Sequence, residues 1–345
     1  MKQLVIILFI VAGSFLKSTA QTTKTPLEYL EFISNQNHDL NKQIWEYTKA
    51  VAHDKNPRKI EKIRKSLVVQ IQQSRAKVQK KPSYNNDDTY KNQFINFLNV
   101  YENVINNDYA KIVDMKEIAE QSYDFMEAYI LMQQQVDTKM ETALDSINAS
   151  QKEFATKYDI ELVNGEESSI SKKMKVSNEV FHHKNDAYLP FFKANFQESE
   201  LIVSLSSGNV GEIQQKATSL LTFTEEGLDS ITKLKPYKND GALILATEKM
   251  LLFYKNEAEV QMPKIIEFYL LNDKVEKMKQ AIENKKEKDR TKEEIDEFNE
   301  MVKKMNIKIT EYNQLNDELN NKRAKLLNEW ETTNHNFLSK HIPKN

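Results

Sequence analysis

Tyr84-Asn85-Asn86-Asp87 is followed 153 residues later by Tyr237-Lys238-Asn239-Asp240. The two stretches belong to a gap-free alignment of residues 56–115 with residues 209–268, which holds 13 identities in 60 positions. Sequences of ordinary composition match by chance at about one position in sixteen. The other identities include Leu98 with Leu251, Tyr101 with Tyr254, Asn103 with Asn256, Lys111 with Lys264, and Ile112 with Ile265. We therefore expect a duplicated structural unit.

The composition favours helices along the whole chain. Only 6 of the 345 residues are glycine, too few for the frequent turns of a sheet protein. We therefore predict an all-α fold. The expected helices span residues 26–53, 57–80, 87–106, 109–162, 168–206, 209–234, 240–261 and 263–286, with a last helix from Ile295. The pattern leaves open whether 109–162 is one helix or two, and Pro190 predicts a bend in 168–206.

Helix starts are marked by capping residues. Thr25-Pro26-Leu27-Glu28 and Thr291-Lys292-Glu293-Glu294 both match a capping box, in which a threonine and a glutamate bond each other's backbone N–H groups. Asn56 precedes Pro57, which is favoured at the first helical position. Asn86-Asp87 and the matched Asn239-Asp240 predict two further starts, because short polar side chains accept from free N–H groups.

The repeat and the length of the chain predict two helical bundles. About 325 residues follow a leader of 20, enough for two domains of the usual ~150 residues. We place a first bundle repeat at 21–164 and a second at 165–345. The turn Val163-Asn164-Gly165-Glu166 marks the expected junction.

The C-terminal region carries a heptad pattern. Apolar positions from Ile295 to Phe337 alternate at spacings of three and four, which is typical of a coiled coil. Val275, Met278 and Ile282 can supply an antiparallel arm, so the second bundle should carry an extended coiled-coil-like hairpin over 263–340. Asn316 and Arg323 interrupt the seam, and they either fix its register or face a solvated gap. The seam positions are Ile295, Phe298, Val302, Met305, Ile309, Tyr312, Asn316, Leu319, Arg323, Leu326, Trp330, Thr333 and Phe337.

Residues 1–20 have the pattern of a cleavable signal peptide. A lysine precedes an apolar run from Leu4 to Ala12, and small residues end the segment at Ala20, before Gln21. The run is shorter than the ~20 residues that span a bilayer, and no later stretch is apolar enough. No cysteine is present, which excludes lipid attachment through cysteine and disulfides. We expect cleavage after Ala20 and a protein, not a lipoprotein, in a bacterial periplasm, at the outer surface or outside the cell.

One short segment has potential metal ligands. Glu179-Val180-Phe181-His182, with His183 and Asp186, places four such side chains within two turns of one helix. The di-iron sites of helical bundles need two Glu-x-x-His motifs, and only one is present. The alternative function is therefore a metal-binding protein or metalloenzyme centred on Glu179 and His182, although a solvated histidine pair explains the segment as well.

The sequence offers no other chemistry-bearing motif. Neither a His-Glu-x-x-His motif, a nucleophile elbow nor a phosphate-binding glycine loop is present. We predict no enzyme, no catalytic, cofactor-binding or metal residue, and no cofactor. The formal net charge of -2 gives no general attraction to nucleic acid, and we expect no nucleic-acid partner.

Residues 57–81 form a basic segment with nine Lys or Arg residues and one acid, Glu61. Such a helix can dock on an anionic glycan, lipid head groups or nucleic acid. Alternatively, it is neutralised by residues 108–145, which hold nine acids and three lysines. The matched segment 210–235 is not basic, so this charge does not belong to the repeat.

Aromatic residues gather around Pro190. Such a cluster lines a ligand pocket or forms core, and the pocket gives a second alternative function, a small-ligand sensor or carrier that uses region 181–196. Tyr101 and Tyr254 are likewise expected to be buried through their rings, with a pair of ligand sites as the alternative. The clustered residues are Phe181, Tyr188, Phe191, Phe192 and Phe196.

The signal peptide, the absent cysteine and the duplicated Tyr-x-Asn-Asp helical unit resemble uncharacterised families of exported bacterial all-helical surface proteins. The resemblance implies an architecture of helical bundles and assigns no site residue. The function we expect is binding or structural interaction, with an unknown protein or a surface glycan as the partner.

Overall fold

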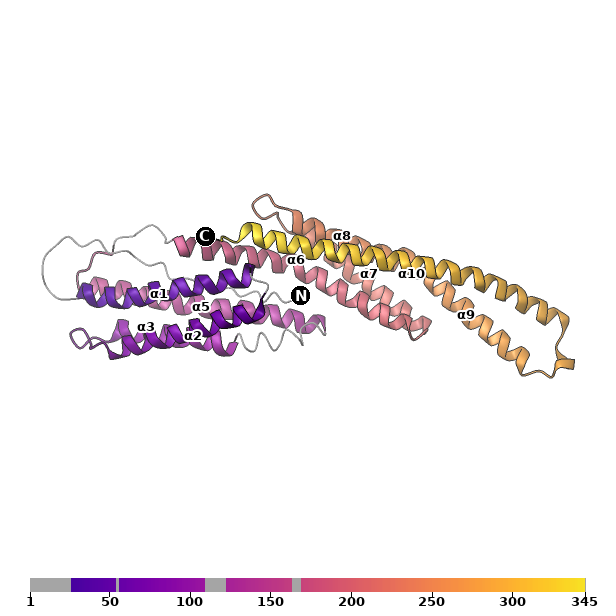
Figure 1. Cartoon of the computed structure of the whole chain (residues 1–345), viewed down its shortest axis with the longest axis horizontal. Coiled ribbons are helices and arrows are strands. Elements are labelled where there is room, and N and C mark those ends of the chain that lie inside the picture. The colour runs from indigo at the N-terminus through magenta and orange to yellow at the C-terminus, as the bar shows by residue number, and fades with distance from the viewer. Residues whose placement is uncertain (1–25, 54–55, 109–121, 163–168, 345) are drawn as a thin grey trace. The chain divides into compact units, whose positions relative to one another are not determined.

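The computed structural model describes residues 26–53, 56–108, 122–162 and 169–344 (Figure 1). In these residues the chain forms helices and no strand beyond two isolated bridges. The prediction of an all-α fold is therefore confirmed. The helices are α1 (Pro26–His53), α2 (Pro57–Lys80), α3 (Thr89–Asn103), α5 (Tyr123–Lys157), α6 (Ser169–Leu205), α7 (Val210–Lys233), α8 (Ala242–Asn256), α9 (Met262–Glu283) and α10 (Lys292–His341).

Contacts divide the chain into two compact units. Unit 1 takes its described residues from 1–185 and 336–345, and unit 2 consists of 186–335. The division lies inside α6 and inside α10, whereas the sequence placed the junction at 163–166, which lies outside the described residues. α6 and α10 therefore each contribute to both cores.

Unit 1 is a bundle in which α1 packs on α2, α2 on α3 and α3 on α5 (Figure 1). Apolar side chains three or four positions apart give each helix one buried stripe. An aromatic cluster closes one end of the bundle, where Phe154 of α5 contacts Tyr29 and Tyr84. The fully buried side chains include Leu30, Ile33, Leu67, Ile71, Leu98 and Val104.

In unit 2, α7 packs closely on α8. Gly227 of α7 permits this approach, because a Cβ atom there would lie 3.0 Å from a methyl carbon of Leu251. Trp330 of α10 stacks on Phe191 of α6 with ring centroids 4.3 Å apart, and its Nε1 donates to Thr247 Oγ1 of α8 at 2.9 Å. Trp330 thus joins α6, α8 and α10 in one core.

Elements of the two units correspond at the offset of 153. α2 and α7 both have 24 residues, and α3 and α8 both have 15. Each of α3 and α8 continues into a five-residue π-helix, η1 (Val104–Asp108) and η2 (Glu257–Gln261). The described elements from Asn56 to Asp108 therefore have the same bounds as those from Asn209 to Gln261.

The turn before α3 and the turn before α8 also share their backbone. Asn85 and Asn86 have φ of 48° and 58°, and Lys238 and Asn239 have φ of 47° and 64°. In both turns the aspartate N–H donates to the tyrosine carbonyl three residues earlier at 2.8 Å. Asparagine favours this left-handed conformation, and Asn86 and Asn239 are identical in the alignment.

The expected burial of Tyr101 and Tyr254 is confirmed, whereas α3 and α8 begin two residues after Asp87 and Asp240, at Thr89 and Ala242. Asp87 Oδ1 accepts from the Thr89 N–H at 2.9 Å, and Asp240 Oδ1 accepts from the Ala242 N–H at 3.0 Å. Tyr101 is 1% exposed and Tyr254 is 0% exposed. Matched residues therefore have matched roles.

The sequence left open whether 109–162 is one helix or two, and it predicted a bend at Pro190. α5 runs without a break through residues 133–135, and α6 is one helix through Pro190, where the bend stays a prediction. α10 begins at Lys292, three residues before Ile295, because the Thr291–Glu294 capping box sets its start. The expected Thr25 cap and the span 109–121 lie outside the described residues.

Candidate functional site

The core of unit 2 holds three charged side chains from three elements: Glu198 of α6, Glu257 of η2 and Arg323 of α10. The carboxylates are almost fully buried, at 2% and 1% exposure. Arg323 Nε donates to Glu198 Oε1, Nη2 donates to Glu257 Oε1 at 2.6 Å, and Nη1 donates to Asn320 Oδ1 at 2.5 Å. We call Glu198, Glu257 and Arg323 the buried charge cluster.

Packing around the buried charge cluster keeps water away from it. Arg323 Cζ lies 5.8 Å from the ring centre of Phe253, a cation–π distance. Tyr254, one turn before Glu257, donates its hydroxyl to Asn195 Oδ1 of α6 at 2.7 Å. Because these side chains are shielded from water, an unpaired charge among them would destabilise the folded state.

Two carboxylates share one guanidinium, which shifts their pKa values. Burial first and then the charge of Glu257 raise the pKa of Glu198 to about 8, and Arg323 opposes both. Burial also raises the pKa of Glu257, again opposed by Arg323. With one guanidinium between them, two ionised carboxylates would leave one negative charge unpaired in a buried site. A single proton on one of the two carboxyl groups would balance the buried charge cluster.

The position in unit 1 that matches Glu257 is apolar. It is Val104, the first residue of η1, and its side chain is fully buried. A π-helix of the same length therefore forms in unit 1 without a carboxylate at this position.

Sequence reasoning identified Arg323 as an interruption of the heptad seam but missed Glu198 and Glu257. Arg323 lies 125 residues from Glu198 and 66 from Glu257. No local pattern relates positions so far apart. The internal alignment carried a usable signal, because Glu257 is a charged residue where Val104 stands in a buried apolar position.

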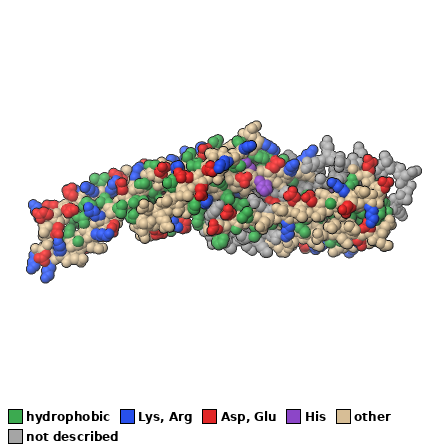
Figure 2. All heavy atoms as spheres, turned by 180° about the vertical axis from the view of Figure 1, so that it is seen from behind, with side chains coloured by type: hydrophobic (Ala, Val, Ile, Leu, Met, Phe, Trp, Pro, Cys, Tyr) green, Lys and Arg blue, Asp and Glu red, His purple; other side chains and the backbone are tan. Residues whose placement is uncertain are grey.

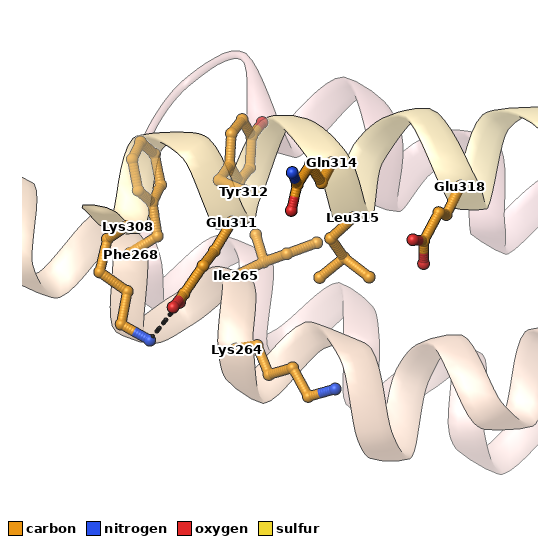
Figure 3. Close-up of a pocket in the computed structure, with 9 residues that line it drawn as sticks. All are labelled: Lys264, Ile265, Phe268, Lys308, Glu311, Tyr312, Gln314, Leu315 and Glu318. Carbon is orange, nitrogen blue, oxygen red and sulfur yellow. Dashed lines mark hydrogen bonds and ion pairs between the residues drawn. The ribbon is translucent and has the colours of Figure 1, made fainter. Parts of the chain in front are cut away.

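A second feature of unit 2 is a groove between α9 and α10 (Figure 3), with a volume of about 270 Å³. Phe268 and Tyr312 stack across it with ring centroids 4.4 Å apart. Lys308 Nζ pairs with Glu311 at 2.8 Å along one rim. The remaining lining residues are Lys264, Ile265, Gln314, Leu315 and Glu318.

The α9–α10 hairpin exposes apolar side chains. Ile307 is 61% exposed and Leu270 is 53% exposed, and the seam residues Ile295 and Ile309 are also exposed. Other seam residues, Met305 among them, are buried, so the hairpin covers only part of its apolar surface. Figure 2 shows hydrophobic side chains interspersed with charged ones toward the narrow end of the molecule, where acidic and basic side chains both lie.

The outer face of α8 is also more apolar than its counterpart in unit 1. Leu245 and Leu252 are exposed and one heptad apart. The matched residues on α3 are Asn92 and Asn99, which are exposed as well. The two exposed leucines of α8 therefore have no apolar counterpart on α3.

The predicted metal ligands do not share one environment. Glu179 and Asp186 are exposed, His182 is half-buried, and His183 is buried with its ring 5.4 Å from that of Phe337. Among the residues that the structure describes, no three His, Cys, Asp or Glu side chains lie close enough together to hold a metal ion.

The aromatic residues near Pro190 pack as core. Phe191 and Phe192 are buried, and Tyr188 contacts both of them and Trp330. Phe196 contacts Phe192 with ring centroids 6.2 Å apart. These contacts match the core interpretation of the cluster, and a ligand site here stays a prediction.

The basic helix α2 is partly neutralised by its neighbours. Arg64 pairs with Glu61 and donates to the Ile105 carbonyl at 2.9 Å. Arg75 pairs with Glu102 of α3. The lysines Lys62 and Lys77 are exposed, so α2 combines paired arginines with solvated lysines.

Comparison of the chain with protein-family models, with curated proteins and with solved structures found no match. The resemblance to exported helical surface proteins accordingly stays a prediction. Of the described helices, none combines the length and the apolar character that crossing a bilayer requires.

Proposed function

We propose that this chain is an exported helical protein that binds a partner through the α9–α10 hairpin and carries out no catalysis. The observation that carries the proposal is the hairpin's exposed apolar surface, with Ile307 as its most exposed large side chain. Soluble monomers rarely expose contiguous apolar surface without a use for it. A helix that leaves part of its heptad seam open is typical of one that packs against a further helix.

The groove favours a helical partner over a glycan. Its floor is formed by Ile265, Leu315 and the Phe268–Tyr312 stack, and its rims carry charges of both signs. An amphipathic helix fits such a groove, with apolar anchors on the floor and charged residues at the rims. Sugars need more hydrogen-bonding groups than this aliphatic floor offers.

Photo-cross-linking in cells that export the protein tests this proposal. A photoreactive residue replaces Ile307 on α10, and a matched variant carries it at Val69 on α2, which is 49% exposed. We expect the Ile307 position to give one protein adduct of defined mass, and the Val69 position to give none.

The result would count against the proposal if both positions gave the same adducts or if Ile307 gave none. An adduct that carbohydrate-cleaving enzymes remove, and proteases do not, would identify a glycan partner instead. Adducts formed at Ile307 and not at Val69 would indicate specific binding, whereas adducts formed at both positions would indicate general surface contact.

We infer further that the elements of 56–108 and 209–261 descend from one duplicated unit. Their equal lengths, identical turns and matched buried tyrosines support this inference. The buried charge cluster and the exposed apolar side chains of the hairpin lie in unit 2, which makes unit 2 the better candidate for binding.

Export rests on the sequence of residues 1–20. We propose cleavage after Ala20 and release into the periplasm or beyond. The intact mass of protein from the exported fraction should begin at Gln21. Full-length protein starting at Met1 in the cytosol would contradict export.

A further inference from the structure

We propose that Glu198, Glu257 and Arg323 form a protonation-controlled latch that holds α10 against α6 and η2 in unit 2. The latch is closed while the two carboxyl groups share a proton and loosens when that proton is lost. This inference concerns the seating of α10 and does not depend on which partner the hairpin binds.

The geometry makes Arg323 the common point of the latch. Its Nε and Nη2 reach carboxylates on two different elements, while Asn320 on its own helix accepts from Nη1. Arginine's planar fork suits this double contact. Loss of either carboxylate contact would release α10 from one of its two neighbours.

The buried charge cluster needs its proton. With both carboxylates ionised, one guanidinium would face two negative charges in a site from which water is excluded. Glu257 Oε2 is buried and accepts no hydrogen bond from a described N–H or O–H donor. A proton on Glu198 makes that carboxyl group a donor and balances the single charge of Arg323.

The surrounding elements bring few other charges to the pair. Among the described residues, the charges that act on Glu198 are those of Glu257 and Arg323. Tyr254 of α8 stays neutral, because burial and both glutamates hold its pKa well above its usual value. α7 and α9 pack on η2, and Lys216 of α7 is engaged by Glu200 of α6 at 3.0 Å.

The direction of the pH effect follows from the raised pKa. In the unfolded chain Glu198 titrates near its ordinary value of 4.5, whereas in the folded protein burial raises its pKa to about 8. The folded state therefore holds a proton that the unfolded state releases between these values. The stabilisation is complete below about pH 4.5 and is lost as the pH rises toward 8.

Trp330 provides a local readout of α10. The chain has two tryptophans, Trp45 and Trp330, so Trp45→Phe leaves one reporter. Trp330 lies two turns after Arg323 on α10, is buried, and donates to Thr247 Oγ1 on α8. Its emission should shift to longer wavelength as α10 loosens and water reaches the indole.

The experiment follows Trp330 emission and the midpoint of thermal unfolding from pH 5.5 to 9 in the Trp45→Phe protein. Glu198→Gln is nearly isosteric, and its amide donates to Glu257 as the protonated acid would. Glu200→Gln, two residues along the same helix and part of an exposed ion pair, is the matched control. Glu257→Gln is a second variant, which removes the second carboxylate and leaves Glu198 beside Arg323 alone.

We expect a transition near pH 8 in the Trp45→Phe protein and in the Glu200→Gln control. Glu198→Gln should abolish it, and Glu257→Gln should move it to lower pH, because the charge of Glu257 no longer opposes the ionisation of Glu198. The proposal would be overturned if Trp330 emission and the unfolding midpoint of the Trp45→Phe protein stayed constant from pH 5.5 to 9. This measurement does not depend on whether the other variants fold. An unchanged transition in Glu198→Gln would overturn it equally.

Discussion

Tyr101 and Tyr254 occupy matched places in the two units, and each lies fully within its core. Truncating a buried aromatic side chain removes its transfer free energy and leaves a cavity. Tyr254→Ala and Tyr101→Ala should therefore each lower the unfolding free energy by about 3 kcal/mol. Tyr254→Phe removes only the hydrogen bond to Asn195 and should cost about 1 kcal/mol.

Denaturant unfolding of each variant and of the wild-type protein measures these losses in unfolding free energy. Phe125, which is 47% exposed on α5, provides the control, and Phe125→Ala should change stability by less than about 0.5 kcal/mol. Equal losses in Tyr254→Ala and Phe125→Ala would contradict the packing described for unit 2.

The burial of the two tyrosines could be predicted from the sequence, because an aromatic residue three positions after a leucine recurs on one helical face in both copies. The buried charge cluster could not. Its formation depends on α6, η2 and α10 meeting in space, and a heptad pattern alone cannot tell a buried arginine from a solvated one. The pattern for Arg323 left both outcomes open.

At the scale of elements, helix starts were the most predictable features. Asn56 and Thr291 cap helices as their local sequences indicate, because a cap needs only residues within one turn. Asp87 and Asp240 each accept from the first N–H of the helix that follows, from one position before its N-cap. The π-turns η1 and η2 were not predicted. A shift from i→i+4 to i→i+5 hydrogen bonding has no strong local signature and is set by packing.

The capping box at Thr291 fixes the start of α10 at the turn of the hairpin. The Glu294 N–H donates to Thr291 Oγ1 at 3.2 Å, and the Thr291 N–H donates to Glu294 Oε2 at 3.1 Å. Thr291→Ala should weaken the first turn by about 1 kcal/mol. Hydrogen exchange of residues 292–296 should then quicken several-fold.

Thr310→Ala is the control, since Thr310 is an exposed residue in the middle of the same helix. Exchange at 292–296 should stay at the wild-type rate in this variant. If Thr291→Ala also left exchange at 292–296 unchanged, the cap would not determine where α10 begins.

At the scale of the whole molecule, the repeat predicted equal elements in the two halves, and these appear in 56–108 and 209–261. The limits of the compact units were harder to predict, because α6 and α10 each contribute to both cores. Turn-forming residues signal a junction only when a domain ends in a loop. Here the division lies within helices, where the sequence shows no change in pattern.

The proposed latch belongs to unit 2, where it involves η2, and η2 has a counterpart of equal length in unit 1, η1. Hydrogen exchange of the whole protein, expressed as protection factors at pH 6 and pH 8.5, tests it most directly, because η1 is a built-in control for η2. We expect protection to fall at pH 8.5 in 257–261 and in 316–330, with 104–108 unchanged. Equal changes in the two π-helices, or none in either, would contradict the claim.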